Sequence, residues 1–184
     1  MSFEQIKLAY GAAYSSGTGY IGAVLITDYK GFPLEFRYTD PIIPTKIQQV
    51  LYGEGLEKYI KLDVITDSLI KAISNKIEVL LVQDDSLLHY KSDNTTIVRV
   101  SPTKTSPMSE PGEISKVKKS EFLLQTSHSS CPVRLQFNHD FNCEENEKFS
   151  SIIKTLTEVG NFIDIDEPLT RINKTLELIC NQEI

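Results

Sequence analysis

Residues 20–39 place the strongest constraint on how this chain folds. Over 20–27, apolar side chains occupy both alternating sets of positions, which is typical of a strand covered on both faces. Asp28-Tyr29-Lys30-Gly31 supplies turn-forming residues. Residues 34–39 then alternate apolar and polar side chains, as a half-buried strand does. We therefore predict a β-hairpin whose first strand lies in the middle of a sheet.

Helical and strand patterns follow one another through the rest of residues 1–101. Thr45 and Gln48 form a capping box that begins a helix. Gly53 and Gly55 weaken that helix by about 1 kcal/mol each, so a break is expected there. Thr66-Asp67-Ser68 is expected to cap a separate final helix. With strands predicted at 6–14, 77–82 and 96–100, the expected order is β-β-β-α-α-β-β.

The remainder of the chain divides at a segment rich in proline, serine and lysine. Residues 102–119 contain few apolar side chains, and we expect a flexible loop or linker. Beyond it, residues 120–184 predict a β-β-α-α segment, with strands at 121–125 and 133–137 and helices that begin at Asn142 and Asp166.

The fold class that follows is α+β, or α/β, with a mostly antiparallel sheet. Residues 1–101 would form one sheet module. The alternative is that residues 120–184 belong to the same domain and share its sheet across the loop.

Composition indicates an ordinary globular protein. Apolar residues make up 40% of the chain and charged residues 24%, and no apolar run approaches the roughly 20 residues that span a bilayer. Met1–Gln5 shows no basic segment followed by an apolar one, so we expect no signal peptide. Three cysteines make a poor disulfide framework. Together these features predict a cytoplasmic protein.

The charge distribution argues against nucleic acid as the main ligand. The net charge is −6, and residues 120–184 carry five basic against eleven acidic side chains. An acidic surface repels phosphate backbones. Residues 102–119 have four basic and two acidic side chains. A local basic patch formed on the folded surface stays open as an alternative.

No cofactor site is predicted. Gly17-Thr18-Gly19-Tyr20-Ile21-Gly22 matches the dinucleotide-binding string. That mechanism needs a helix N-terminus directly after the glycines, and here a strand is predicted instead. The string is therefore interpreted as a glycine-rich turn, and we expect the protein to bind no cofactor.

A set of histidines and cysteines is the most plausible metal-ligand spacing. His128, Cys131, His139 and Cys143 would all have to surround one ion if they bound zinc. The strand predicted at 133–137 works against this, since it separates Cys131 and His139 by some 26 Å. We therefore expect unrelated loop histidines and buried thiols, with a zinc site as the alternative.

Other candidate site residues lie at strand ends and at the hairpin tip. Asp28, Asp84 and Asp85 follow predicted strands, where carboxylates often bind metal or act as acid and base. Solvated turns are the simpler interpretation. Tyr29 and Phe32 lie at the hairpin tip, where the chain cannot easily bury them, and they are candidates for a partner-binding patch.

The segment Gly22–Gly53 carries a resemblance. It contains Gly22-Ala-Val-Leu-Ile-Thr-Asp28, then Gly31-Phe-Pro-Leu-Glu-Phe36, then Pro44-Thr45 and Leu51-Tyr52-Gly53. In this segment the chain is similar to a group of bacterial proteins to which no function is attached. The resemblance implies a bacterial source and transfers no site residues.

Two functions are predicted as alternatives. The first is a non-catalytic subunit or adaptor of a bacterial multi-protein assembly, which would act through protein–protein contacts, because no acid/base, nucleophile or phosphate-binding set is apparent. The second is a small-molecule or metal-binding sensor, or a hydrolase. Its site would form only on folding, from Asp28, Asp84 and Asp85 or from His128, Cys131, His139 and Cys143.

Overall fold

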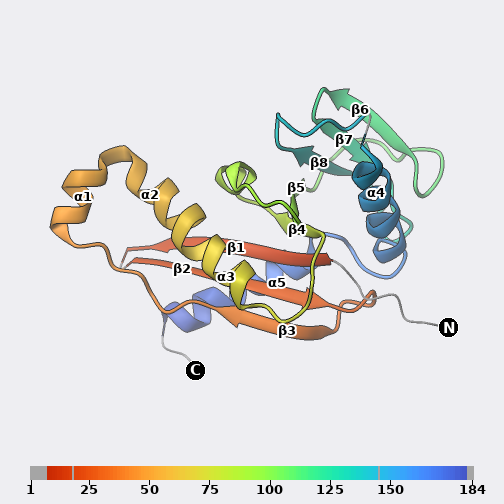
Figure 1. Cartoon of the computed structure of the whole chain (residues 1–184). Coiled ribbons are helices and arrows are strands. Elements are labelled where there is room, and N and C mark those ends of the chain that lie inside the picture. Colours follow the sequence, from red (N-terminus) through yellow and green to blue (C-terminus); the bar gives the residue numbers. More distant parts are fainter. Residues whose placement is uncertain (1–7, 18, 145, 182–184) are drawn as a thin grey trace.

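The structure, a computed structural model, describes residues 8–17, 19–144 and 146–181. Its centre is an eight-stranded mixed sheet with the strand order β3-β2-β1-β4-β5-β8-β7-β6 (Figure 1). Strands β1, β4 and β5 run parallel to one another, and all other neighbours are antiparallel. The strands are β1 (Leu8–Ser16), β2 (Gly19–Thr27), β3 (Pro33–Tyr38), β4 (Val79–Val82), β5 (Thr96–Ser101), β6 (Ile114–Lys118), β7 (Glu121–Leu124) and β8 (Val133–Phe137).

The helices form layers on both faces of the sheet. A nearly continuous helical segment crosses one face over β1 and β2, and its first part, α1, projects away from the sheet (Figure 1). On the opposite face, α5 (Glu167–Cys180) packs on β1 and β2, and α4 (Glu147–Val159) packs against β7 and β8. The helical segment consists of α1 (Lys46–Tyr52), η1 (Gly53–Gly55), α2 (Leu56–Tyr59), η2 (Ile60–Thr66) and α3 (Asp67–Ala72).

Two hydrophobic cores result from these layers. The larger core lies between the sheet and α4 and α5, and it extends across nearly all the strands. The smaller core lies under η2, α3 and the short 3₁₀ helix η3 (Asp85–His89), and it covers β1, β2, β4 and the start of β5. Burial of apolar surface, at about 25 cal/mol per Å², is the main stabilising contribution in both cores.

The predicted fold class is confirmed, because the structure combines a mixed, mostly antiparallel sheet with helices. The hairpin is confirmed as well. In β2, residues 21–27 are all buried, as expected for a strand covered on both faces. The first predicted strand begins at Leu8 and extends to Ser16, and its expected start at residue 6 lies outside the described residues. Strands β5 and β8 form where the sequence predicts them.

The helical segment confirms one cap and corrects another. Thr45 and Gln48 form the predicted capping box, and the helix breaks into a 3₁₀ turn at Gly53–Gly55. However, Thr66 does not cap a new helix. Its backbone is helical and its hydroxyl donates to the Lys61 carbonyl, so η2 continues directly into α3. A threonine hydroxyl can bond a preceding carbonyl within a helix as well as cap one, and sequence spacing does not separate these two roles.

Two further boundaries differ from the predictions. Helix α4 begins at Glu147, with Asn146 as its N-cap, and not at Asn142. Residues 114–118, expected within a flexible loop, form β6 because they pair with β7. β5 also pairs with β8, so strands from residues 1–101 and 120–184 lie in one sheet.

Within the described residues, no helix is both long enough and apolar enough to cross a bilayer. The cytoplasmic location stays a prediction.

Candidate functional site

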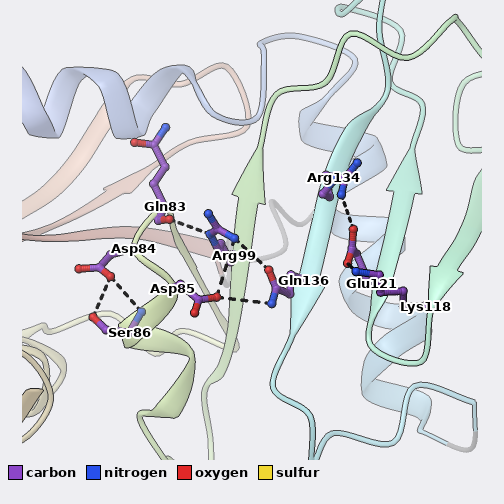
Figure 2. A network of polar contacts seen from close by, with 9 residues as sticks. All are labelled: Gln83, Asp84, Asp85, Ser86, Arg99, Lys118, Glu121, Arg134 and Gln136. Carbon is purple, nitrogen blue, oxygen red and sulfur yellow. Dashed lines mark hydrogen bonds and ion pairs between the residues drawn. The ribbon is translucent and has the colours of Figure 1, made fainter.

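One half of the sheet leaves a polar face uncovered by helices. Registers across β5, β8, β7 and β6 align one set of side chains on this face, and the alternating residues between them point into the core under α4. We call this surface the open face, and Figure 2 shows its polar contacts. It is formed by Arg99, Ser101, Ser115, Lys118, Glu121, Leu123, Arg134 and Gln136.

Arg99 is the centre of the contacts at the carboxyl end of β4. Its Nε donates to the Gln83 carbonyl oxygen at 2.9 Å, and its Nη1 donates to Gln136 Oε1 at 3.0 Å. Asp85 Oδ1 lies 3.8 Å from the same Nη1 and accepts from Gln136 Nε2 at 3.4 Å (Figure 2). The Arg99 side chain keeps 34% of its surface exposed. Its guanidinium is therefore held in place and also accessible to a ligand.

Asp84, the neighbouring carboxylate, is engaged elsewhere. It accepts from the Ser86 amide at 2.9 Å and pairs with Lys61 at 2.8 Å. Burial raises the pKa of Asp84. The hydrogen bonds from Lys61 and Ser86 lower it by more, so the net shift is downward. Burial conversely lowers the pKa of Lys61, and Asp84 and Glu57 raise it by more. Asp84 is thus an ionised structural partner and not a proton donor at neutral pH.

A second ion-pair group occupies the far side of the open face. The Glu121 carboxylate accepts from Arg134 Nη1 and lies 3.7 Å from Lys118 Nζ (Figure 2). Glu121 is buried, whereas Arg134 and Lys118 keep 42% and 75% of their side-chain surface exposed. The cations of this group therefore face solvent, with their counter-charge beneath them.

These groups are suited to recognising an anion. The guanidinium groups of Arg99 and Arg134 match the planar geometry of phosphate or carboxylate oxygens, and Gln136 helps to hold Arg99 in place. The described residues contain no group of three or more His, Cys, Asp or Glu side chains that could hold a metal ion. Binding is the chemistry that the arrangement supports directly.

The predicted carboxylate set is not brought together. Asp28 caps the β2–β3 turn, where its Oδ1 accepts from the Lys30 and Phe32 amides at 2.9 Å each. The register of β2, β1 and β4 places this turn beside the start of β4, whereas Asp84 and Asp85 follow the end of β4. Even the adjacent Asp84 and Asp85 face different partners.

The predicted histidine and cysteine set is not brought together either. Strand β8 forms as expected and separates Cys131 from His139. Cys143 is buried, and burial raises the pKa of its thiol. The His128 amide donates to the Gly160 carbonyl at the end of α4.

The two aromatic residues of the hairpin tip have different surroundings. The Tyr29 ring packs edge-on against Phe162, with centroids 5.1 Å apart, while Phe32 is 65% exposed. Tyr29 therefore contacts the segment between α4 and α5, and only Phe32 projects as the sequence predicts for both.

Sequence reasoning missed Arg99, Arg134 and Gln136. A signal was present, because Thr-Ile-Val-Arg-Val at 96–100 and Val-Arg-Leu-Gln-Phe at 133–137 place polar side chains at alternate positions. That alternation predicts an uncovered face. Which strands lie side by side, and thus which polar residues meet, depends on the sheet order.

Comparisons with known proteins locate the fold. Neither the family models nor the curated proteins contain a match. Among solved structures, endonuclease V from Bacillus subtilis superposes with a TM-score of 0.58 and 13% identity, over 96% of this chain and 82% of that one. This likeness shows a shared fold.

Two other solved structures are more distant. Ciona intestinalis endonuclease V, in complex with a 23mer DNA containing an inosine, gives a TM-score of 0.47 at 12% identity, over 97% of this chain and 88% of that one. Marinitoga piezophila Argonaute with a 5′ OH guide RNA gives 0.46 at 17% identity, over 94% of this chain and 30% of that one. Of these three, only the Bacillus subtilis protein has a TM-score above 0.5.

The shared fold corrects two predictions. A non-catalytic adaptor or complex subunit that acts by protein–protein contacts is wrong as the main function, because the chain has the fold of a nuclease. The expectation that nucleic acid is an improbable main ligand is contradicted as well. It relied on a net charge of −6, which averages over the whole surface, whereas the sheet gathers Arg99, Arg134 and Lys118 on one face.

Proposed function

We propose that this protein binds nucleic acid through the open face of its sheet. The observation that carries the proposal is the presence of two partly exposed guanidinium groups, Arg99 and Arg134, on a sheet face that none of the described helices covers. The fold shared with an endonuclease supports this choice of ligand over other anions. Arginine contacts to phosphate oxygens position a nucleic-acid strand without reading its sequence.

Local charge supports the proposal despite the acidic total. The open face and its rim carry Arg99, Arg134 and Lys118 against Asp85 and Glu121, so positive charge is in excess by one (3 − 2). Nearby, Lys61 pairs with both Asp84 and Glu57. Because charges beyond a Debye length of about 8 Å are largely screened at physiological salt, the distant acidic helices weaken binding only slightly.

Fluorescence anisotropy with labelled single-stranded and double-stranded oligonucleotides tests the proposal. The variant Arg99→Gln/Arg134→Gln should bind on the order of tenfold or more weakly, since each lost phosphate contact removes about 1 kcal/mol or more. The slope of log K against log salt should become shallower by about 2.

A matched control removes two exposed lysines far from the open face. Lys46→Gln/Lys154→Gln lowers the net charge by the same amount and should leave affinity nearly unchanged. Circular dichroism checks that both variants are folded. An absence of binding by the wild type at low salt, or an equal loss in the control, would reject the proposal.

Hydrolysis of the bound strand is the second candidate function. Asp85 favours it, because this carboxylate begins η3 just beyond the end of β4, lies beside Arg99, and is 64% exposed. Carboxylates at such strand ends often act in catalysis. Labelled oligonucleotides incubated with Mg²⁺ or Mn²⁺ should be cut by the wild type and not by Asp85→Asn. Binding without cleavage would reject hydrolysis and leave the binding proposal intact.

A further inference from the structure

Strand β3 presents an unpaired edge that is chemically unlike the other edge of the sheet. β3 and β6 are the two outermost strands. Unpaired edges promote association with other chains, and lysines and bulges are usual protections against it. β6 has both protections, with Lys116, Lys118 and a register shift between them. β3 contains no lysine, and its register shift lies only at its first residue, Pro33.

The free hydrogen-bonding groups of β3 belong to its even-numbered residues. The Thr39 amide donates to the Gly22 carbonyl at 2.9 Å. Because antiparallel neighbours alternate between bonded and non-bonded pairs, Arg37 and Glu35 also bond toward β2. The backbone groups of Leu34, Phe36 and Tyr38 therefore point away from the sheet. Pro33 faces β2, so its missing N–H does not interrupt this outer row.

The side chains of the same three residues are apolar. Leu34 is 60% exposed and Tyr38 is 50% exposed, while Phe36 lies between them and packs partly against the larger core. The rings of Phe36 and Tyr38 are 5.9 Å apart. The outer edge of β3 thus combines free backbone groups with exposed apolar surface. Among the described residues, none pairs with this edge.

The sequence Leu34-Glu35-Phe36-Arg37-Tyr38 is complementary to itself when it runs antiparallel. A two-fold axis at Phe36 places Leu34 opposite the second copy's Tyr38, and Glu35 opposite its Arg37. Like charges at facing positions destabilise a strand pair. If the pairing shifted by two residues in either direction, Glu35 would face Glu35 or Arg37 would face Arg37. Only the axis at Phe36 avoids facing like charges, while Glu35 keeps its contacts with Arg37, Ser74 and Asn75 of its own chain.

We propose that two copies of this protein pair through their β3 strands, antiparallel and with Phe36 on the two-fold axis. The result is an isologous dimer with one continuous sheet. Backbone hydrogen bonds from Leu34, Phe36 and Tyr38 join the copies, and the apolar pairs lie on the same face as α5. This inference goes beyond nucleic-acid binding, because β3 and the open face lie in opposite halves of the sheet.

Sedimentation velocity over a wide range of protein concentration tests the association. The wild type should approach twice the 20.8 kDa monomer mass as concentration rises. Leu34→Lys should shift the dissociation constant upward by on the order of tenfold or more, because a lysine on the outer edge opposes pairing. The matched control is Leu51→Lys on α1, at a residue that is 76% exposed, and it should leave association unchanged.

Disulfide trapping tests the register. In the proposed dimer, Leu34 and the second copy's Tyr38 form a hydrogen-bonded pair with Cα atoms about 5.5 Å apart, within the range that a disulfide spans. Leu34→Cys/Tyr38→Cys should therefore cross-link between chains under mild oxidation. Within one chain the two positions lie about 13 Å apart along the strand and cannot join.

The single variants Leu34→Cys and Tyr38→Cys should not cross-link, and all variants carry Cys131→Ser and Cys180→Ser to remove accessible native thiols. A monomer at every concentration would overturn the proposal. So would a dimer that Leu51→Lys disrupts, or one in which the single variants cross-link as well as the double variant. Arg99→Gln/Arg134→Gln should dimerise normally, which separates this proposal from nucleic-acid binding.

Discussion

The two halves of the sheet differ in how many of their faces are covered. In the half formed by β3, β2, β1 and β4, helices lie on both faces of the central strands, and every residue of β4 is buried. In the half formed by β5, β8, β7 and β6, α4 covers one face, and β8 alternates buried with half-buried residues. The doubly covered half provides the stable frame, and the singly covered half has room for polar side chains that can bind a ligand.

An alanine scan of one strand from each half is expected to give the largest effects. The side chains of Leu80 and Leu81 point to opposite faces of β4, and both are buried. We consider the substitutions Leu80→Ala and Leu81→Ala. Each should lower the free energy of unfolding by about 3 kcal/mol, from lost burial and the cavity that remains. In β8, Leu135→Ala should lower it equally, but Gln136→Ala only by about 1 kcal/mol. Urea denaturation followed by circular dichroism measures all four values.

The contrast between the two halves of the sheet would be wrong if Leu80→Ala and Leu81→Ala differed in free energy of unfolding as much as Leu135→Ala and Gln136→Ala. That outcome would mean that one face of β4 is accessible to solvent. The m-value should stay constant across the four variants, which confirms that each changes stability and not the extent of unfolding.

A smaller effect is expected where a helix lies closest to the sheet. A Cβ atom added at Gly22 in β2 would lie 2.1 Å from Ile65 Cγ2 and 3.1 Å from the Ala12 carbonyl oxygen. Gly22→Ala should therefore destabilise the protein by about 2 kcal/mol through overpacking. Gly17→Ala is the matched control, because nothing lies within 4 Å of its added Cβ. Equal stability of the two variants would show that η2 can move away from the sheet without loss.

The smallest effect concerns Glu35, which ties β3 to the end of α3. Its carboxylate accepts from the Ser74 amide at 2.9 Å and from Asn75 Nδ2 at 2.7 Å. Burial raises the pKa of Glu35, but these hydrogen bonds and Arg37 lower it by more. The net result is a pKa of about 2, below the ordinary value of 4.5. Because the folded pKa is the lower one, the carboxylate stabilises the fold fully above pH 4.5 and loses this contribution as the pH falls toward 2.

Glu35→Gln should therefore be less stable than the wild type by about 1 kcal/mol at neutral pH, and the difference should shrink between pH 4.5 and 2. Thermal unfolding across that pH range measures the change. Glu54→Gln, on the exposed 3₁₀ turn, serves as the control and should follow the wild type throughout. A constant difference at all pH values would show that the Glu35 charge does not stabilise the fold.

Local patterns in the sequence predicted most of the elements, and their limits are instructive. The hairpin, the capping box at Thr45 and the strand at 133–137 were all predictable, since each depends on neighbouring residues. The start of α4 was not, because Asn142 and Asn146 are equally good capping residues and only packing selects one. β6 was not predicted either. Its residues are mostly exposed, and they form a strand because β7 supplies the hydrogen-bonding partner.

The candidate site illustrates the same limit. Asp84 and Asp85 were recognised because they follow a strand, but their roles were not, since Lys61 and Arg99 reach them from separate elements. Arg99 and Arg134 are 35 residues apart in the sequence, and they share a surface only because β5 and β8 are neighbours.

By itself, the sequence determined most of the strands and helices and, for strands such as β2 and β8, how many faces are buried, because these properties follow from the periodicity of neighbouring side chains. The tertiary structure alone decided the strand order, and with it the open face and the free edge of β3. Pairing between distant strands is set by the packing of the whole sheet, and local residues carry no record of which partner they will meet.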